Sequence, residues 1–438
     1  MKYRFKNTNM YFILLTIVVI VAMVFIFLFS YVVKNQKDEN KSNANKKIIS
    51  NLTQEEKLED FNYLYEVIEK NYPFLEVNKR VNNADWKANK DIYLQRVKDT
   101  ENNTDFYMVL EGILRDLNNG HTSMYKANAD KVKSLLKRKV ELEKSDYKYN
   151  WQEKNTINII QNKTFLERNN INLSEDEVKS KEKQVLNQGN NIICKDIIEN
   201  EFGYVRIKSF DDNYIQTDRD SIDKYLDKVK DFKGLIIDIR GNRGGTDLYW
   251  KKVLFPRIIN KTYSSTKYLF YRDGDLEDDY LKYTYGDDLK GVNTVTNDLI
   301  SKCPSITKEI LKDFKYYITD EDKIIPKDPI SYKGKIYLLV DKEVYSASES
   351  LAVFCKQSKL ATLVGEKTGG GDNGIGPATI MLPKSGLLFK FDIALGAHFD
   401  GSSDEEFKVE PDVYIKDPRI SEDLPSDNCI KEILALEK

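Results

Sequence analysis

The hydrophobic pattern begins with one unbroken apolar run near the N-terminus. Residues 10–33 carry no charged side chain and consist almost entirely of aliphatic and aromatic residues. As a helix that rises about 1.5 Å per residue, this run is ~36 Å long, which is enough to cross a bilayer. Lys2, Arg4 and Lys6 precede it, and basic residues favour the cytoplasmic side of a membrane. The pattern predicts one transmembrane helix at the cell membrane, with residues 1–9 in the cytoplasm and the rest of the chain outside.

A cleaved signal peptide is the alternative interpretation of this run. Its apolar region would be about 7–15 residues long and would end at a small-residue cleavage site. Residues 30–33, Ser-Tyr-Val-Val, offer no such site, so we expect an uncleaved anchor. Residues 34–50 are rich in Lys, Asn and Ser and cannot bury enough apolar surface to fold, which predicts a tether.

Two amphipathic helices are predicted after the tether. Thr53 and Glu56 have the spacing of a capping box. Apolar residues then recur every three or four positions, which is the period of a helix face. The first face consists of Leu58, Phe61, Leu64, Tyr65 and Ile68, and the second of Phe106, Leu110, Ile113, Leu114 and Leu117. Asn119-Gly120 is a helix-ending pair, which places His121 just beyond a helix end.

Strand patterns appear further along the chain. Residues 204–207 alternate like a half-exposed strand, whereas 234–239 and 336–340 are short continuous apolar runs of the kind that is buried on both faces. Residues 387–391 follow Pro-Lys-Ser-Gly and predict the return strand of a hairpin. These patterns predict a sheet that helices cover, with an insertion over 246–330 that is rich in Tyr and Asp.

Composition and charge exclude several classes of protein. Of the 438 residues, 41% are hydrophobic and 32% charged, which is typical of globular proteins. Lys and Arg number 68 against 70 Asp and Glu, so no net field attracts a polyanion and nucleic acid is not an expected partner. The two histidines, His121 and His398, and the four cysteines form no cluster of the kind that binds zinc. No metal or other cofactor is predicted.

One glycine-rich motif follows a buried strand and could carry chemistry. Arg-Gly-Asn-Arg-Gly-Gly at 240–245 allows backbone N–H groups to form a nest for a phosphate or an oxyanion. Gly245 is followed by Thr246-Asp247 and not by Gly-Lys-Ser or Gly-Lys-Thr, which disfavours a nucleotide site. A tight turn without a ligand is the plain alternative.

A serine motif and a histidine motif are the other candidates. Tyr-Ser-Ala-Ser-Glu-Ser at 345–350 lies between a buried strand and an apolar helical run. A serine there has its hydroxyl at the positive end of a helix, where a nucleophile is stabilised, although an N-cap serine has the same pattern. Asn-Gly-His-Thr-Ser at 119–123 offers a loop histidine as a general base. A structural histidine is the alternative there, and equally for His398.

In this order, the motifs resemble the family of serine peptidases that includes the C-terminal processing (tail-specific) proteases and the tricorn protease core. The resemblance covers a little under half of the chain, over about 50–125, 200–245 and 333–415. Its motifs are Gly120-His121-Thr122, the stretch 238–245, Ser346-Ala347-Ser348-Glu349, Val364-Gly365-Glu366 and the stretch 409–413 (Val-Glu-Pro-Asp-Val). The resemblance implies a crotonase-like core of ββα units, a helical N-terminal domain and hydrolysis of peptide bonds.

Two departures point to the tricorn-like branch of this family. In the Ser/Lys branch the catalytic lysine lies in a Gly-Glu-x-x-x-Gly-Lys stretch, but aligning Gly365-Glu366 places Gly371 at the lysine position. That branch also tends to carry a PDZ domain, and residues 125–200 show no glycine-rich loop of that kind. In the tricorn-like branch a histidine in the Gly-His-Thr position is the base instead.

The resemblance implies a catalytic set on this chain. Ser346 would be the nucleophile, His121 the base, and Glu405 the acid that supports the histidine. Backbone N–H groups of Gly244 and Ala347 would form the oxyanion hole. A peptide or protein is then the expected substrate.

Alternatives remain at three positions and for the function as a whole. Glu406 could replace its neighbour as the supporting acid, Gly245 could supply an oxyanion donor, and Lys367 could be a displaced base. The plain interpretation of the acidic run and of the lysine is a solvated surface. The alternative functions are an inactive binding protein on the same fold and a Ser/Lys protease that uses Lys367.

The predicted organisation is a mixed α/β (α+β) chain whose segments differ in composition. They are a cytoplasmic tail (1–9), a transmembrane anchor (10–33), a linker (34–50), a helical N-terminal domain (51–125), a variable charged segment (126–200), a catalytic core (201–420) with the insertion 246–330, and a C-terminal segment (421–438). The catalytic core is expected outside the cytoplasm.

Overall fold

The described part of the chain starts at residue 50. The computed structural model describes residues 50–125, 129, 132–133, 135–136, 151–171, 190–303, 306–374, 376–399, 402–403 and 405–438. The transmembrane helix predicted at 10–33 lies outside these residues. Within them, no helix has both the length and the apolar character that a membrane span requires.

The two amphipathic helices predicted early in the chain are confirmed. Helix α2 (Gln54–Asn71) starts at Thr53, whose hydroxyl accepts from the Glu56 N–H while the Glu56 carboxylate accepts from the Thr53 N–H, so the capping box is complete. Helix α5 (Asn103–Arg115) buries its apolar face and is followed by Asn118 in the left-handed region. His121 therefore lies beyond a helix end. Helices α3 (Leu75–Asn82) and α4 (Lys90–Lys98) lie between them in the chain.

A six-stranded sheet contains the apolar runs predicted from the sequence. Its order is β13-β9-β8-β4-β3-β2, and β2 alone pairs antiparallel. The strands are β2 (Ile192–Ile198), β3 (Phe202–Ile207), β4 (Gly234–Asp238), β8 (Lys335–Val340), β9 (Thr362–Gly365) and β13 (Val413–Tyr414). The predicted strands at 204–207, 234–239 and 336–340 are β3, β4 and β8. The first was expected to be half-exposed, but β3 is buried on both faces because helices cover both sides of the sheet.

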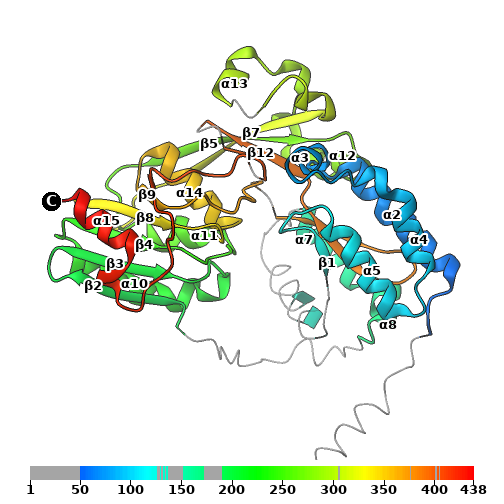
Figure 1. Cartoon of the computed structure of the whole chain (residues 1–438), viewed down its shortest axis with the longest axis horizontal. Helices are drawn as coiled ribbons and strands as arrows, with labels where there is room; N and C mark the ends of the chain where they lie inside the picture. Colours follow the sequence, from blue (N-terminus) through cyan, green and yellow to red (C-terminus); the bar gives the residue numbers. More distant parts are fainter. Residues whose placement is uncertain are drawn as a thin grey trace, which may run out of the picture. The chain divides into compact units, whose positions relative to one another are not determined.

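Helices cover both faces of this sheet, because successive residues of a strand point to opposite sides. On one face, α10 (Ile215–Val229) and α14 (Ala347–Ser358) pack against side chains such as Ile237 and Leu338. On the other face, α15 (Asn428–Leu436) packs against Ile236 and Leu339. Figure 1 shows α15, in red, lying over β3, β4 and β8. The fold is therefore a mixed α/β fold with a helix-covered sheet.

Two smaller sheets share a second hydrophobic cluster with the early helices. One has the order β1-β11-β10 and the other β12-β5-β7-β6. Their strands are β1 (Ser123–Tyr125), β5 (Tyr263–Tyr271), β6 (Lys290–Gly291), β7 (Tyr316–Ile324), β10 (Ala378–Met381), β11 (Leu388–Phe391) and β12 (Ala394–His398). The predicted hairpin is β10–β11, and the insertion 246–330 contributes the long pair β5–β7.

Further helices connect these sheets. They are α7 (Trp151–Ile160), α8 (Lys163–Arg168), α11 (Asp247–Tyr249), the π-helix η3 (Trp250–Leu254), α12 (Asp275–Tyr285) and α13 (Asn297–Lys302). Asp247–Leu254 directly continues the glycine motif at 240–245, so the insertion starts at the edge of the candidate site.

A buried ion cluster fixes the end of β4 to the C-terminal helix. The Arg240 guanidinium bonds both carboxylate oxygens of Asp238 (2.9 and 2.6 Å) and both of Asp427 (3.2 and 3.0 Å). All three side chains are fully or almost fully buried. Because the glycine motif starts at Arg240, this cluster holds the motif in place.

Replacing Arg240 by Met should be strongly destabilising. Two carboxylates would remain buried without their cation, and loss of one partner of a buried ion pair costs about 3–5 kcal/mol. The denaturation midpoint in urea measures the loss. Arg419→Met is the matched control, because Arg419 pairs with Asp417 in the same bidentate way but in solvent, and its midpoint should stay near that of the wild type. Equal shifts for the two variants would contradict the account.

Candidate active site

The serine motif lies at a strand-to-helix junction, as predicted. Ser346 follows the turn after β8 and is the N-cap of α14, with φ 61° and ψ −127°. A non-glycine residue rarely adopts positive φ, and such strained residues concentrate at functional sites. The Ser346 N–H donates to the Gly370 carbonyl at 3.0 Å, and its own carbonyl accepts from Ser350. The backbone is thus held from both sides, and the hydroxyl is half-buried at the positive end of a helix.

The glycine motif approaches this serine closely. A Cβ atom at Gly244 would lie 2.7 Å from the Tyr345 carbonyl oxygen, 2.8 Å from Ser346 Cβ and 2.9 Å from the Ala347 nitrogen. Only glycine fits there, and its φ of 96° is also one that side chains avoid. The predicted neighbourhood of the glycine motif and the serine motif is therefore present in the structure.

The backbone donors beside the serine differ from the expected pair. The Gly244 N–H already donates to Asn242 Oδ1 at 2.9 Å. Within the described residues, the N–H groups of Gly245 and Ala347 have no hydrogen-bond partner. Gly244 therefore allows the glycine motif to lie close to the serine motif. The N–H donors that are open to a ligand belong to Gly245 and Ala347.

Strand pairing brings His121 opposite Asp392. In the antiparallel pair of β1 and β11, Ser123 lies opposite Lys390 and Met124 opposite Phe389. Continuing that register by two residues places His121 across from Asp392. The side chains meet: His121 Nδ1 lies 3.0 Å from Asp392 Oδ1 and 3.1 Å from Oδ2.

The His121 ring also contacts the residue next to the serine. Its centroid lies 4.8 Å from that of the Tyr345 ring. A Cβ atom at Gly120 would lie 2.8 Å from Tyr345 Cζ, so the histidine loop packs directly on this tyrosine. Within the described residues, His121 Nε2 and the Ser346 hydroxyl form no hydrogen bond with each other or with another group. Both atoms are open to a ligand, and catalytic hydrogen bonds often tighten only when a substrate is bound.

Glu405, the predicted supporting acid, is connected to His121 through Tyr345 and Asn119 and forms no hydrogen bond with the ring itself. Its Oε1 accepts from the Tyr345 hydroxyl at 2.7 Å and from Asn119 Nδ2 at 3.0 Å. The same Asn119 amide also donates to Asp392 Oδ2 at 3.1 Å. Direct contact with the histidine is made by Asp392, so the two acids form one network in which Asp392 is the nearer.

The other candidate residues from the sequence, Glu406, Lys367 and His398, make their contacts outside this network. Glu406 pairs with Arg80 at 2.7 Å, and Lys367 pairs with Glu410 at 2.5 Å. His398 is buried with its Nε2 3.7 Å from Asp372. None of these pairs includes Ser346 or His121.

Burial and charge shift the pKa values in this network. Burial disfavours the charged form of His121, but the charge of Asp392 and its hydrogen bond outweigh burial, so the pKa of His121 is raised above its ordinary value. Burial raises the pKa of Glu405 to about 7, against the hydrogen bond from Tyr345, and the charge of Asp392 adds to the rise. The site therefore holds a carboxyl group that titrates near neutral pH beside a histidine whose pKa is raised.

Sequence reasoning missed Asp392, Asn119 and Tyr345. Asp392 is fully buried between Phe391 and Ile393 at the end of β11. A lone carboxylate within an apolar strand end is costly unless it has a partner, and this was the signal available in the sequence. Its partner depends on the register between strands more than 260 residues apart, which local patterns do not specify.

Comparisons with known proteins agree with this site. Residues 201–415 match the sequence model of peptidase family S41, and residues 53–114 match that of the tricorn protease C1 domain. The chain is therefore similar to peptidase family S41 across the region that contains the serine motif and the glycine motif. It is a serine-type peptidase, and the resemblance predicted from its motifs is confirmed.

Several solved structures are similar to this chain at low sequence identity. A candidate peptidase from Parabacteroides merdae has a TM-score of 0.53 and 19% identity, over 89% of this chain and 97% of that one. Mature CPAF has a TM-score of 0.49 and 13% identity, over 82% and 92%. The photosystem II D1 C-terminal processing protease has a TM-score of 0.39 and 14% identity, over 82% and 93%. The first supports the fold alone, and no curated protein sequence matches the chain.

Asp392→Asn should lower the activity of this serine peptidase and shift its pH profile. Loss of the carboxylate removes both the hydrogen bond that orients the ring and the charge that favours imidazolium, so the pKa of His121 falls. The ascending limb of kcat/KM against pH should move to lower pH, and the maximum should fall roughly 10²- to 10⁴-fold.

Glu405→Gln is the matched control for this prediction. It removes a carboxylate that does not contact the His121 ring directly. The shift of the ascending limb of kcat/KM and the fall of its maximum should therefore both be smaller than in Asp392→Asn. A larger loss in Glu405→Gln than in Asp392→Asn would show that Glu405 is the direct partner during catalysis.

Proposed function

We propose that this chain hydrolyses peptide bonds through an acyl-enzyme formed on Ser346. In this mechanism His121 Nε2 takes the hydroxyl proton as the oxygen attacks the peptide carbonyl, and then gives it to the leaving amine. Asp392 holds the Nδ1 side of the ring and balances the imidazolium. The observation that carries the proposal is the register that places His121 between Asp392 and the Tyr345-Ser346 turn.

Oxyanion stabilisation is assigned to the N–H groups of Ala347 and Gly245. Ala347 supports it because its nitrogen is the first of α14, where the helix dipole favours negative charge. Gly245 supports it because its N–H is open and exposed next to a glycine that abuts Ser346. Loss of one such donor typically costs about 10²- to 10³-fold in rate.

Glu405 acts in this proposal as a positioning acid behind the direct partner. Its hydrogen bonds to Tyr345 and Asn119 fix the two residues that flank the histidine ring. A pKa near neutrality lets this carboxyl group lose or gain a proton as the charge on His121 changes, which limits the build-up of like charge beside Asp392.

Ser346→Ala and His121→Ala should each abolish turnover and labelling by a fluorophosphonate probe, because the nucleophile or its base is lost. The assay measures peptide hydrolysis and in-gel labelling of the full-length chain. Ser358→Ala, at the far end of α14, and Lys367→Ala should both retain activity. Retained turnover in either active-site variant would reject the assignment, and lost turnover in Lys367→Ala would favour a Ser/Lys mechanism. A wild-type chain that neither hydrolyses peptides nor labels would be the inactive binding protein.

The finer architecture and the location belong to the same proposal. The parallel strands β3, β4, β8 and β9 with α10 and α14 support a crotonase-like core in residues 201–420. The uncharged run at 10–33 supports a single membrane anchor with the catalytic part outside the cytoplasm.

The anchor predicts how the chain fractionates in cells. The full-length chain should sediment with membranes and resist extraction by alkaline carbonate, whereas a chain that lacks residues 1–33 should not. Protease added to intact cells should digest the region after residue 50, since it lies outside. A mature N-terminus downstream of residue 30 would contradict the anchor and indicate a cleaved signal peptide.

A further inference from the structure

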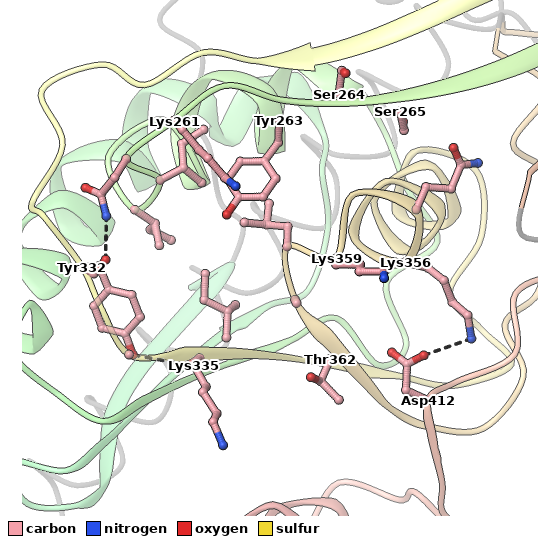
Figure 2. Close-up of a pocket in the computed structure, with 18 of the residues that line it drawn as sticks. Lys261, Tyr263, Ser264, Ser265, Tyr332, Lys335, Lys356, Lys359, Thr362 and Asp412 are labelled. Carbon is pink, nitrogen blue, oxygen red and sulfur yellow. Dashed lines mark hydrogen bonds and ion pairs between the residues drawn. The ribbon is translucent and has the colours of Figure 1, made fainter.

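A large cavity lies away from the serine and the histidine. It has a volume of about 1330 Å³ and lies among residues 258–261 after η3, the start of β5, the start of β8 and the end of α14. Figure 2 shows Lys261, Tyr263, Tyr332, Lys335 and Lys359 around it. Small-molecule sites usually measure about 300–1,000 Å³. The cavity is larger, which favours a segment of polypeptide as its occupant.

One wall of the cavity is an open strand edge. Strand β12 covers β5 only from Lys267 to Tyr271, whereas β7 pairs with β5 along its whole length from Tyr263. Residues 263–266 therefore have no strand on their other side within the described part of the chain, and all four line the cavity. An open edge of this kind accepts an added strand.

The direction of the backbone groups agrees with an added strand. The Thr266 N–H donates to Gln357 Oε1 at 3.3 Å, so it points away from β7. In an antiparallel ladder this direction alternates, so the N–H and carbonyl of Ser264 point to the same open side. Neither group has a partner among the described residues. The buried Nε2 of Gln357 likewise has none, although it lines the cavity.

The charged side chains around the cavity are mostly positive. Its lining contains five lysines against a single carboxylate, Asp412. That carboxylate is 3.2 Å from Lys356, and Lys335 pairs with Glu437. Lys333 and Lys359 are exposed and have no ion-pair partner among the described residues. An occupant with negative charge is therefore favoured.

We propose that this cavity binds an acidic, extended polypeptide segment that adds as a strand to the open edge of β5 at residues 263–266. Backbone hydrogen bonds to Ser264 set the register of the segment, and Lys333 and Lys359 select its acidic side chains. The site is separate from Ser346 and does not depend on the peptidase mechanism proposed above.

Fluorescence anisotropy with the full-length chain in mild detergent tests this site. The probe is a fluorescein-labelled octapeptide of alternating Glu and Val, and the same peptide with Lys in place of Glu is its charge-reversed counterpart. The chain carries Ser346→Ala, so that cleavage cannot remove the probe. The acidic peptide should bind saturably, and the basic one should not.

Two pairs of variants separate charge from backbone pairing. The double variant Lys333→Glu/Lys359→Glu should weaken binding at least about tenfold, because like charges now face the peptide. The control Lys98→Glu/Lys224→Glu makes the same change in charge on exposed residues of α4 and α10 and should bind as before. Ser264→Pro removes the outward N–H and should abolish binding, whereas Ser264→Ala should not.

Three results would overturn the proposal. Absence of binding by the acidic peptide would exclude the site. Equal binding by the Lys333→Glu/Lys359→Glu variant would place the peptide elsewhere, including at the catalytic serine. Binding that survives Ser264→Pro and is displaced by inorganic polyphosphate would show a site for free anions and no strand addition.

Discussion

The pairing of β1 with β11 is the constraint on which the candidate active site depends. It joins a strand of three residues that follows the histidine loop to a strand almost 270 residues later. Because side chains alternate between the two faces of a strand, a slip by one residue would turn Asp392 away from His121. The hydrophobic cluster that buries Phe389 and Phe391 together with the early helices fixes this register. The packing of the hydrophobic core therefore also sets the geometry of the site.

Tyr345 connects this register to the serine. Its ring contacts His121, its hydroxyl donates to Glu405, and its carbonyl and neighbouring backbone abut Gly244. Gly371 also approaches the ring, since a Cβ atom there would lie 2.5 Å from Tyr345 Cζ. The strained backbone of Ser346 is held because the residue before it is packed on all these sides. Strain of this kind persists only where the surrounding structure over-determines it.

The sequence predicted what depends on local patterns. The capping box at Thr53, the helix faces, the buried runs that became β4 and β8, and the hairpin before Phe391 all follow from periodicity or turn chemistry over a few residues. The family resemblance, and not a local pattern, predicted that the serine and glycine motifs meet. They lie beside each other in the structure because both follow central parallel strands, whose carboxyl ends meet at one edge of the sheet. Local reasoning failed where a partner is chosen by long-range pairing. Asp392 was missed for this reason. The Gly244 N–H is a different case, because the resemblance assigned it to a ligand whereas the side chain of Asn242, two residues earlier, accepts it.

A crystal structure of the fluorophosphonate adduct on Ser346 tests the central claim most directly. The account predicts a phosphonyl oxygen within hydrogen-bond distance of the Ala347 and Gly245 nitrogens. It also predicts His121 Nε2 facing the adduct while Nδ1 stays on Asp392. An adduct in which His121 has left Asp392, or in which another side chain occupies its place beside the serine, would contradict the account.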